Sequence, residues 1–342
     1  MDRRGMKVGI ITEGSASIGF GHITRCISLY EVFEDNGDEP FFIINGDEAV
    51  ADLVSGKRLH VFDWINEADR FFGYVRDSDM VILDSYLAGR SFYKRVSDEA
   101  GCAVYIDDFK RMDYPKGVVL NGAISSEKLG YPKREEMSYI LGAQYAFLRS
   151  EFRKAPKKDI PALPETALIT FGGEDMRRMT PRVLEMFRSG FPELSVLVIV
   201  GKGFKEVGRI EQLTGNGVEL IYHPDARAMR DAMGKADISI SAGGQTLYEL
   251  ASMGVPTVGI GVADNQKVNL SGWEAAGFMT FAGWHDDPEI IENVRRCVMG
   301  LMPRQERRRC SEIGQRIIDG KSPDRAYSAL NKILLERGDG PN

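Results

Sequence analysis

Short hydrophobic runs alternate along most of the chain with longer stretches in which apolar positions recur at helical spacing. The run over 8–12 predicts a strand, and the stretch over 22–36 places Ile23 and Ile27 on one face of a predicted helix. Further runs predict strands over 40–44, 80–84, 103–106 and, as a short last strand, 118–120. Alternation of strand and helix is typical of a doubly wound parallel sheet.

The pattern breaks at the lysine- and proline-rich segment 153–164 and then restarts. Strands are predicted over 167–171, 195–200, 218–222, 238–241 and 257–260, and helices over 181–188, 226–233 and 246–253. Residues 288–336 are helical in pattern, with an interruption at 321–323. We therefore predict an α/β protein of two Rossmann-like domains, each a doubly wound parallel sheet, facing a cleft, with a helical C-terminal tail. The predicted boundaries are 1–155 for the N-terminal domain, 156–164 for a linker, 165–320 for the C-terminal domain and 321–342 for a last helix that could pack back on the N-terminal domain.

Length and composition agree with this picture and exclude several classes of protein. The 342 residues suit two domains, and 43% hydrophobic with 27% charged residues is ordinary for a globular chain. A net charge of −6 argues against a nucleic-acid partner, which would call for a basic surface. It leaves a small anionic ligand open, because local donors can bind phosphate on an acidic protein.

Targeting and cysteine patterns point to a cytoplasmic location. No apolar run reaches the roughly 18 residues of a membrane helix, and the first residues do not read as a signal peptide. The four cysteines are far apart and form no CxxC pair, so we expect reduced thiols rather than a disulfide framework or a zinc site. No metal-ligand signature is present in the sequence, and the oligomeric state is not indicated.

The first candidate motif is GSASIGFGH, residues 14–22, directly after the first predicted strand. Its small residues let a ligand approach the backbone, and the helix that follows would turn free N–H groups toward that ligand. His22 is the sharper signal, because an imidazole at such a junction can act as a general base near neutral pH. On position alone, His22 could equally cap or pack the start of the helix.

The second motif, FGGED, follows the first strand of the second predicted domain and includes Gly172 and Gly173. A glycine pair ahead of a helix is a candidate phosphate-facing loop, and its alternative is a tight turn without a ligand.

The strongest motif is SAGGQTLYELASMGVPTVGI, residues 241–260. A strand ends at a small-residue loop and a helix opens at Gln245 and Thr246, so unpaired N–H groups should face a diphosphate above the loop. Glu249 lies on the same helical face as Gln245, where its carboxylate could accept two ribose hydroxyls. The alternative for Glu249 is a solvated or capping carboxylate.

Polar residues follow other predicted strands and could also contact a ligand. Asn265 and Gln266 come after the strand over 257–260, with Asn269 on the next helix, and an ordinary polar loop is the alternative. In the first domain the strand ends carry Asp84-Ser85-Tyr86, Asp107-Asp108 and Asn121, and the aspartate pair could equally serve as turn and capping residues.

At this point the motifs resemble a known group of enzymes. The segment 241–260 resembles the donor-nucleotide motif of glycosyltransferases with two Rossmann-like domains, the GT-B fold, among them the lipid-II-forming N-acetylglucosaminyltransferase family. The motifs GSASIGFGHITRC, LDSY, IDDF, VLNGA and LGAQYAFLRSEF, in that order, resemble the UDP-sugar hydrolase family of pseudaminic acid biosynthesis and the related spore-coat polysaccharide proteins. The resemblance runs from about residue 7 to about residue 280.

That resemblance implies an activity and roles for individual residues. The hydrolase family removes UDP from UDP-2,4-diacetamido-2,4,6-trideoxy-β-L-altrose, and the histidine of GFGH, here His22, is its proposed base for activating water against C1 with inversion. Taken with the motifs above, the implied nucleotide-binding residues are Gly172, Gly173, Ser241, Ala242, Gly243, Gly244, Gln245, Thr246 and Glu249. The implied residues around the sugar are Gly21, Arg25, Tyr86, Asp107, Asn121, Asn265, Gln266 and Asn269. No cofactor or obligatory metal is expected, since UDP is part of the nucleotide-sugar substrate.

The chain departs from the hydrolase family after residue 280, where about sixty mostly helical residues end in IDGKSPDRAYSALNKIL. That tail looks more like the spore-coat proteins and the transferases. The alternative activity is therefore an inverting GT-B glycosyltransferase using a UDP-sugar in surface polysaccharide biosynthesis. A third hypothesis, a non-catalytic nucleotide-sugar binder or scaffold, is disfavoured by His22 accompanying a complete donor motif.

Overall fold

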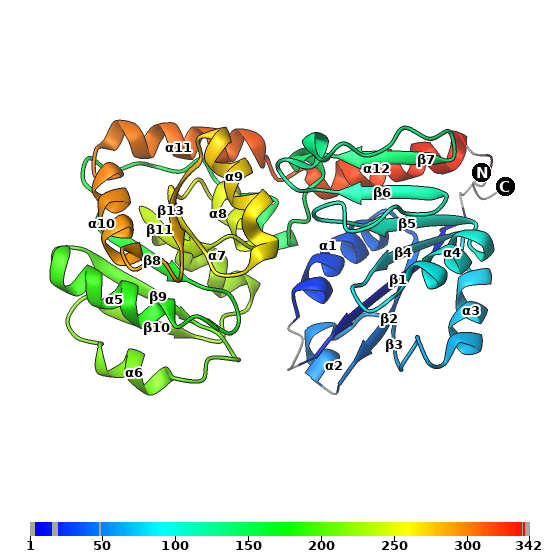
Figure 1. The fold of residues 1–342 in the computed structure, drawn as a ribbon, viewed down its shortest axis with the longest axis horizontal. Helices are drawn as coiled ribbons and strands as arrows, with labels where there is room; N and C mark the ends of the chain where they lie inside the picture. The colour runs from blue at the N-terminus through cyan, green and yellow to red at the C-terminus, as the bar shows by residue number, and fades with distance from the viewer. Residues whose placement is uncertain (1–3, 16–19, 48, 337, 339–342) are drawn as a thin grey trace. The chain divides into compact units, whose positions relative to one another are not determined.

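The computed structural model describes residues 4–15, 20–47, 49–336 and 338, and within them the chain divides into two compact units (Figure 1). Unit 1 comprises Met1–Ser150 together with Lys321–Asn342, and unit 2 comprises Glu151–Gly320. The chain therefore leaves unit 1, builds unit 2 and returns to unit 1.

Unit 1 is built on a seven-stranded parallel sheet in the order β3-β2-β1-β4-β5-β6-β7. Its strands are β1 (Lys7–Gly14), β2 (Glu39–Gly46), β3 (Leu59–Val61), β4 (Met80–Asp84), β5 (Cys102–Ile106), β6 (Gly117–Asn121) and β7 (Met137–Leu141). The central strands are buried along nearly their whole length, because both faces of the sheet are covered, and continuous hydrophobic runs are what such strands require.

Alternating side chains of these strands enter two separate cores. On one face, Val8 and Ile10 pack with α1 (Gly21–Asp35) and with Leu330 and Leu334 of α12 (Ser322–Glu336). The opposite face packs against α3 (Ala68–Arg76) and α4 (Arg90–Glu99). The remaining helical elements of unit 1 are short: α2 (Ala49–Leu53), η1 (Ser126–Leu129), η2 (Ala143–Tyr145) and η3 (Ser150–Phe152).

The edge of this sheet differs from the sequence prediction. The run over 118–120 is not the last strand, because β7 pairs beyond it in parallel. The connections 107–116 and 122–136, which join β5 to β6 and β6 to β7, are fully described, and neither contains an α-helix. A crossover without a helix has no helical periodicity, so no pattern in this segment predicts a further parallel strand.

Unit 2 repeats the architecture with a six-stranded parallel sheet in the order β10-β9-β8-β11-β12-β13. Its strands are β8 (Thr166–Thr170), β9 (Ser195–Val200), β10 (Val218–Tyr222), β11 (Ile238–Ala242), β12 (Thr257–Gly261) and β13 (Met279–Trp284). Its helices are α5 (Met179–Gly190), α6 (Val207–Gln212), α7 (Ala226–Lys235), α8 (Thr246–Ser252), η4 (Asp264–Gln266), α9 (Lys267–Ala276), α10 (Ile290–Gly300) and α11 (Arg304–Ile317). Two parallel doubly wound sheets with helices confirm the predicted fold class.

The segment predicted as a linker is irregular but bound along unit 2. Carbonyls of Pro156, Ile160 and Pro161 accept hydrogen bonds from side chains of α11, among them the fully buried Arg307. The division between the units falls at Ser150, five residues before the expected boundary at 155.

The last helix, α12, completes the core of unit 1 and lies along β7 in Figure 1, where it is drawn in red. Tyr327 packs edge-on against Phe33 of α1 at a ring distance of 5.1 Å. Its hydroxyl donates a hydrogen bond of 3.0 Å to Asp38. Among the described residues, the structure holds no helix with the length and apolar character needed to span a bilayer.

Candidate functional site

His22 and Asp84 meet at the carboxyl end of the unit 1 sheet. His22 is the second residue of α1, and Asp84 is the last residue of β4, where it lies opposite Thr12 of β1 in the parallel register. His22 Nδ1 lies 2.8 Å from Asp84 Oδ1. The His22 side chain is 17% exposed and that of Asp84 1%, so the pair combines a buried carboxylate with an imidazole that solvent reaches.

The neighbours of the imidazole decide which ring nitrogen carries the proton. Nδ1 is also 3.1 Å from Nη2 of Arg25, which could donate to it. An unprotonated Nδ1 would, however, place its lone pair against the carboxylate at 2.8 Å, while Arg25 Nη2 already donates to the same carboxylate at 2.5 Å. We therefore assign the proton to Nδ1, which leaves the lone pair of Nε2 available as a proton acceptor.

Arg25 links this pair to a second carboxylate. Its Nε and Nη2 bond both oxygens of Asp84, and its Nη1 bonds Asp108 at 2.6 and 2.7 Å. Burial alone would raise the pKa of Asp84, but the charges of Arg25 and His22 outweigh it and hold the pKa well below its ordinary value. Burial also works against the charged form of Arg25, yet the two carboxylates raise its pKa, so the cluster stays ionised.

Tyr86 closes the cluster into a ring of contacts. Its hydroxyl donates to Asp108 at 2.9 Å, and its ring meets that of His22 edge-on at 4.6 Å. The backbone N–H of Tyr86 donates to Oε1 of Glu13, a residue of β1 that is only 1% exposed. Glu13 Oε2 is buried and has no hydrogen-bond partner among the described residues.

Two residues predicted to contact the sugar, Asp107 and Asn121, make hydrogen bonds within unit 1. Asp107 Oδ1 accepts backbone bonds from the turn that follows it, and Oδ2 accepts the hydroxyl of Tyr131. Asn121 donates to the same hydroxyl at 2.9 Å and accepts a backbone bond from Ala123. These bonds agree with the turn alternative for Asp107, and neither side chain belongs to the ring around His22.

The second predicted site is the loop between β11 and α8 in unit 2. Gly244 has open space where a Cβ would stand, whereas a Cβ at Gly243 would lie 2.5 Å from Leu270. Gly243 is therefore required for packing, and Gly244 keeps the backbone accessible. Ser241 is buried, and its hydroxyl donates to the carbonyl of Ala242 at 3.0 Å.

Side chains predicted as ligand contacts hold this loop in place. Gln266 Oε1 accepts the N–H of Gly243 at 3.2 Å and that of Val262 at 3.1 Å. Asn269 donates to the carbonyl of Gly243 at 2.7 Å and accepts the hydroxyl of Tyr248. The N–H of Gly243 is therefore already satisfied by Gln266 in this structure.

Four further predicted residues lie in α8, in η4 and in the loop after β8. Glu249 lies in the first turn of α8 and is 4% exposed, so a solvated surface carboxylate does not describe it. Asn265 is exposed in η4. Gly172 has a positive φ of 74°, and neither Gly172 nor Gly173 has an atom within 4 Å of a built Cβ, which leaves this loop open for close approach.

The loop that carries Gly172 is anchored by Asp175, whose two carboxylate oxygens accept the N–H groups of Met179 and Thr180 at the start of α5. Burial raises the pKa of Asp175 despite these bonds. Residues 16–19 of the predicted loop before His22 lie outside the described residues. Within the described part of the chain, no group of three His, Cys, Asp or Glu side chains is placed to hold a metal ion.

The sequence named His22, Arg25 and Tyr86 but could not show how they are joined. Asp84 and Asp108 were predicted as strand-end residues that could contact a ligand, not as partners of His22 and Arg25, and Glu13 carried no signal. In the sequence, Glu13 is a single acidic residue at the end of a hydrophobic run, a position that does not by itself indicate a functional site. A buried acidic residue at the end of a strand, just before a glycine-rich loop, is the signal that could have found it.

Comparisons of sequence find distant relatives. No protein-family model matches the chain. The chain is 25% identical over 74% of its length to an uncharacterised protein of Methanocaldococcus jannaschii, covering 55% of that protein. It is 22% identical over 80% of its length to the pseudaminic acid cytidylyltransferase and UDP-2,4-diacetamido-2,4,6-trideoxy-beta-L-altropyranose hydrolase of Helicobacter pylori, covering 47% of it. The chain thus spans about half the length of these two relatives.

A third relative matches from end to end. The spore coat polysaccharide biosynthesis protein of Bacillus subtilis is 20% identical, with 96% of this chain and 98% of that protein covered.

Solved structures show the same fold at low sequence identity. The calicheamicin glycosyltransferase has a TM-score of 0.64 at 14% identity, with 97% of this chain and 98% of that chain covered. Acinetobacter baumannii MurG has a TM-score of 0.59 at 14% identity, with 96% of this chain and 99% of that chain covered. The MnaA–UDP co-structure from S. aureus has a TM-score of 0.64 at 12% identity, with 96% of this chain and 97% of that chain covered. The chain therefore has the GT-B fold, with two Rossmann-like domains.

Proposed function

We propose that this protein is a nucleotide-sugar hydrolase that releases UDP from a UDP-activated acetamido deoxy sugar. In the proposed reaction, Nε2 of His22 takes a proton from water, and the water oxygen forms a bond to C1 of the sugar. The bond from C1 to the diphosphate oxygen breaks, UDP leaves with the electron pair, and the configuration at C1 inverts.

The observation that carries this proposal is the hydrogen bond between His22 and Asp84. A buried carboxylate that accepts the Nδ1 proton fixes the imidazole tautomer and stabilises the imidazolium that forms when Nε2 takes a proton. A histidine that only capped the start of α1 would have no need of a buried anion behind it. The edge-on ring of Tyr86 further restricts the orientation of the imidazole.

Two similarities support a UDP-sugar as the substrate. The relative from Helicobacter pylori is named as a hydrolase of such a compound, and the structurally similar MnaA of S. aureus was solved with UDP. In this chain, the open backbone at Gly244 and at Gly172–Gly173 is suited to a diphosphate, and we assign UDP binding to these loops together with Glu249. Electrostatic stabilisation of the leaving diphosphate would then come from backbone donors.

A second candidate function is an inverting UDP-sugar glycosyltransferase of surface polysaccharide biosynthesis. It is favoured by the full-length match to the spore coat polysaccharide biosynthesis protein, because that match includes the C-terminal helices. His22 would play the same part, but the proton would come from a sugar hydroxyl instead of water.

The test measures UDP release from a panel of UDP-sugars, acetamido deoxy sugars included, first without and then with candidate acceptors. His22→Asn is compared with His223→Asn, since His223 is an exposed histidine of unit 2 whose φ of 47° an asparagine tolerates. Release without acceptor that is lost only in His22→Asn supports the hydrolase. Release that needs an acceptor supports the transferase. Release that survives His22→Asn overturns the role of His22, and an absence of both turnover and UDP-sugar binding overturns both functions.

A further inference from the structure

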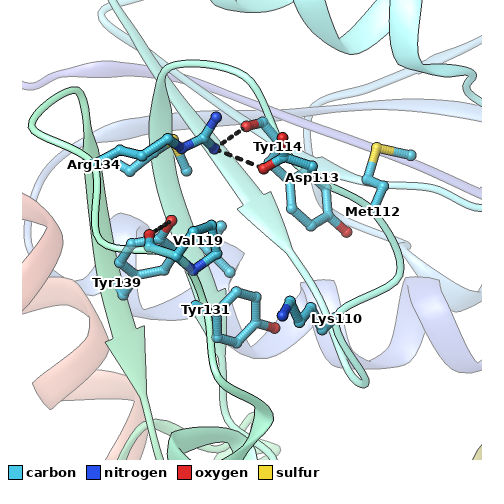
Figure 2. A pocket seen from close by; sticks show the side chains of 10 residues that line it. Lys110, Met112, Asp113, Tyr114, Val119, Tyr131, Arg134 and Tyr139 are labelled. Atoms are coloured by element: carbon cyan, nitrogen blue, oxygen red, sulfur yellow. Dashed lines mark hydrogen bonds and ion pairs between the residues drawn. The ribbon is translucent and has the colours of Figure 1, made fainter.

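A pocket of about 420 Å³ lies at the β6–β7 edge of the unit 1 sheet (Figure 2). It exists because the connections 107–116 and 122–136 cover this face of the sheet without a helix. Side chains of the two connections and of β6 and β7 enclose the space. The volume is in the range of small-molecule sites.

The floor of the pocket is apolar and aromatic. Tyr114, Val119 and Met137 are buried, and the rings of Tyr131 and Tyr139 stand beside one another at 5.3 Å (Figure 2). The Tyr139 hydroxyl is held by the carbonyl of Pro132, so the ring is fixed in place. Fixed aromatic rings offer a surface on which a flat or pyranose ring can stack with little loss of side-chain freedom.

The rim of the pocket is charged and carries more positive than negative groups. Lys110 is exposed, with a strained φ of 60°, and its ammonium donates to the carbonyl of Gly130 at 2.7 Å. Asp113, the one acidic side chain among the described lining residues, pairs with Arg134 at 3.1 Å and with Arg90 at 3.7 Å. Arg134 also donates to the carbonyl of Tyr114 (Figure 2). The negative charge of Asp113 is thus balanced by the two arginines. The positive charge of Lys110 remains at the rim, over the aromatic floor.

We propose that this pocket binds a small monoanion made of one six-membered ring and one carboxylate. The ring stacks on the tyrosines of the floor, and the carboxylate meets Lys110 at the rim. A neutral ring would leave the lysine without its counter-ion, and a cation would be repelled. Both an acidic monosaccharide and an aromatic acid have this chemistry. The site is independent of the reaction proposed at His22, so each can fail without the other.

The test uses the full-length protein with ¹³C-labelled methionine methyl groups. Met112 and Met137 line the pocket, and the other twelve of the 14 methionines serve as internal controls. Sodium glucuronate and sodium 4-hydroxybenzoate are titrated against their uncharged counterparts, glucose and phenol. We expect saturable shifts of the Met112 and Met137 methyl signals with at least one anion, and weaker binding of its neutral counterpart. The anion that binds shows whether the pocket takes an acidic monosaccharide or an aromatic acid.

Two lysine substitutions form a matched pair for the same titration. Lys110→Gln removes the rim charge, whereas Lys133→Gln removes an exposed charge of the other connection, 122–136, that does not line the pocket. We expect about tenfold weaker binding in Lys110→Gln, corresponding to about 1.4 kcal/mol, and no change in Lys133→Gln. Absence of a saturable shift with either anion, equal affinity for the neutral compounds, or equal loss in the two variants would overturn the proposal.

Discussion

Asp84 accepts a hydrogen bond of 2.8 Å from His22 although 62 positions separate the two residues in the sequence. The parallel pairing of β1 with β4 brings the carboxylate to the start of α1. In Asp84→Asn the carboxamide has no charge to stabilise the imidazolium, and its NH₂ can favour the opposite tautomer. We expect the turnover number for UDP release to fall by about 10³- to 10⁴-fold. Turnover within a few-fold of wild type would show that His22 needs no partner.

The same substitution should change how stability depends on pH. The pKa of Asp84 is lowered on folding, so its ionisation stabilises the fold above the ordinary aspartate pKa of about 3.9, and this contribution is lost as pH falls toward the lowered value. At neutral pH, Asp84→Asn should cost about 3–5 kcal/mol, because it breaks a buried ion pair. Urea unfolding of unit 1 can be followed by the fluorescence of Trp64. The difference in unfolding free energy between wild type and Asp84→Asn should decrease from pH 5 to pH 3. A difference in unfolding free energy that stays constant over that pH range would contradict the lowered pKa of Asp84.

Glu13 acts through its acceptor oxygen rather than through its charge. Oε1 accepts the N–H groups of Tyr86 and Leu87, while the charge itself is buried. Glu13→Gln keeps the acceptor and removes the buried charge, so its stability should equal or exceed that of wild type. Glu13→Ala removes the acceptor of the Tyr86 N–H, while the Leu87 N–H keeps its bond to Ser85, so the loss should be about 1–3 kcal/mol. Thermal melting of the two variants checks this, and equal losses would mean that Glu13 works through its charge.

Gly320 is the residue from which the chain returns to unit 1. Its φ is +81°, and a Cβ there would lie 1.9 Å from the carbonyl oxygen of Arg153. Gly320→Ala should therefore destabilise the protein by more than the roughly 1 kcal/mol of an ordinary glycine conformation. Gly300→Ala is the matched control, since that helical glycine has no atom within 4 Å of a built Cβ and should gain about 0.5–1 kcal/mol. Similar melting temperatures for both variants would contradict this prediction.

Removal of α12 should damage unit 1 and spare unit 2. A chain that ends at Gly320 lacks Ala326, Leu330 and Leu334, all of which are buried in the first core. We expect the fluorescence of Trp64 to report a loosened unit 1, while Trp273 in unit 2 keeps its native environment. Single-tryptophan variants separate the two signals. A native signal from Trp64 in the truncated chain would show that α12 is dispensable.

Much of the fold could be predicted because buried parallel strands are short, continuous hydrophobic runs. The strands over 8–12, 80–84 and 257–260 follow directly from that rule. The strands β3, β7 and β13 were not predicted. Only Met137 and Ile140 of β7 are buried, so β7 is not a continuous hydrophobic run, and the connection before it contains no α-helix that could signal a further strand.

The candidate site was less predictable, because strand register decides which of several similar residues meet. Asp107 and Asp108 are adjacent, yet the first closes a turn and the second binds Arg25. The amides of Gln266 and Asn269, predicted as ligand contacts, hold the backbone of a loop in this structure. A polar residue after a strand can satisfy a ligand or the protein itself, and the sequence does not distinguish the two.

The return of the chain to unit 1 has a consequence for biosynthesis. The core that α1 and α12 share with the sheet of unit 1 lacks Leu330 and Leu334 until residue 334 has left the ribosome. Unit 2 is contiguous, so every residue it needs leaves the ribosome before α12 does. Translation adds about 5–20 residues per second. During the synthesis of unit 2, the sheet of unit 1 therefore stays uncovered on the face that α12 later covers, while unit 2 can fold before α12 emerges.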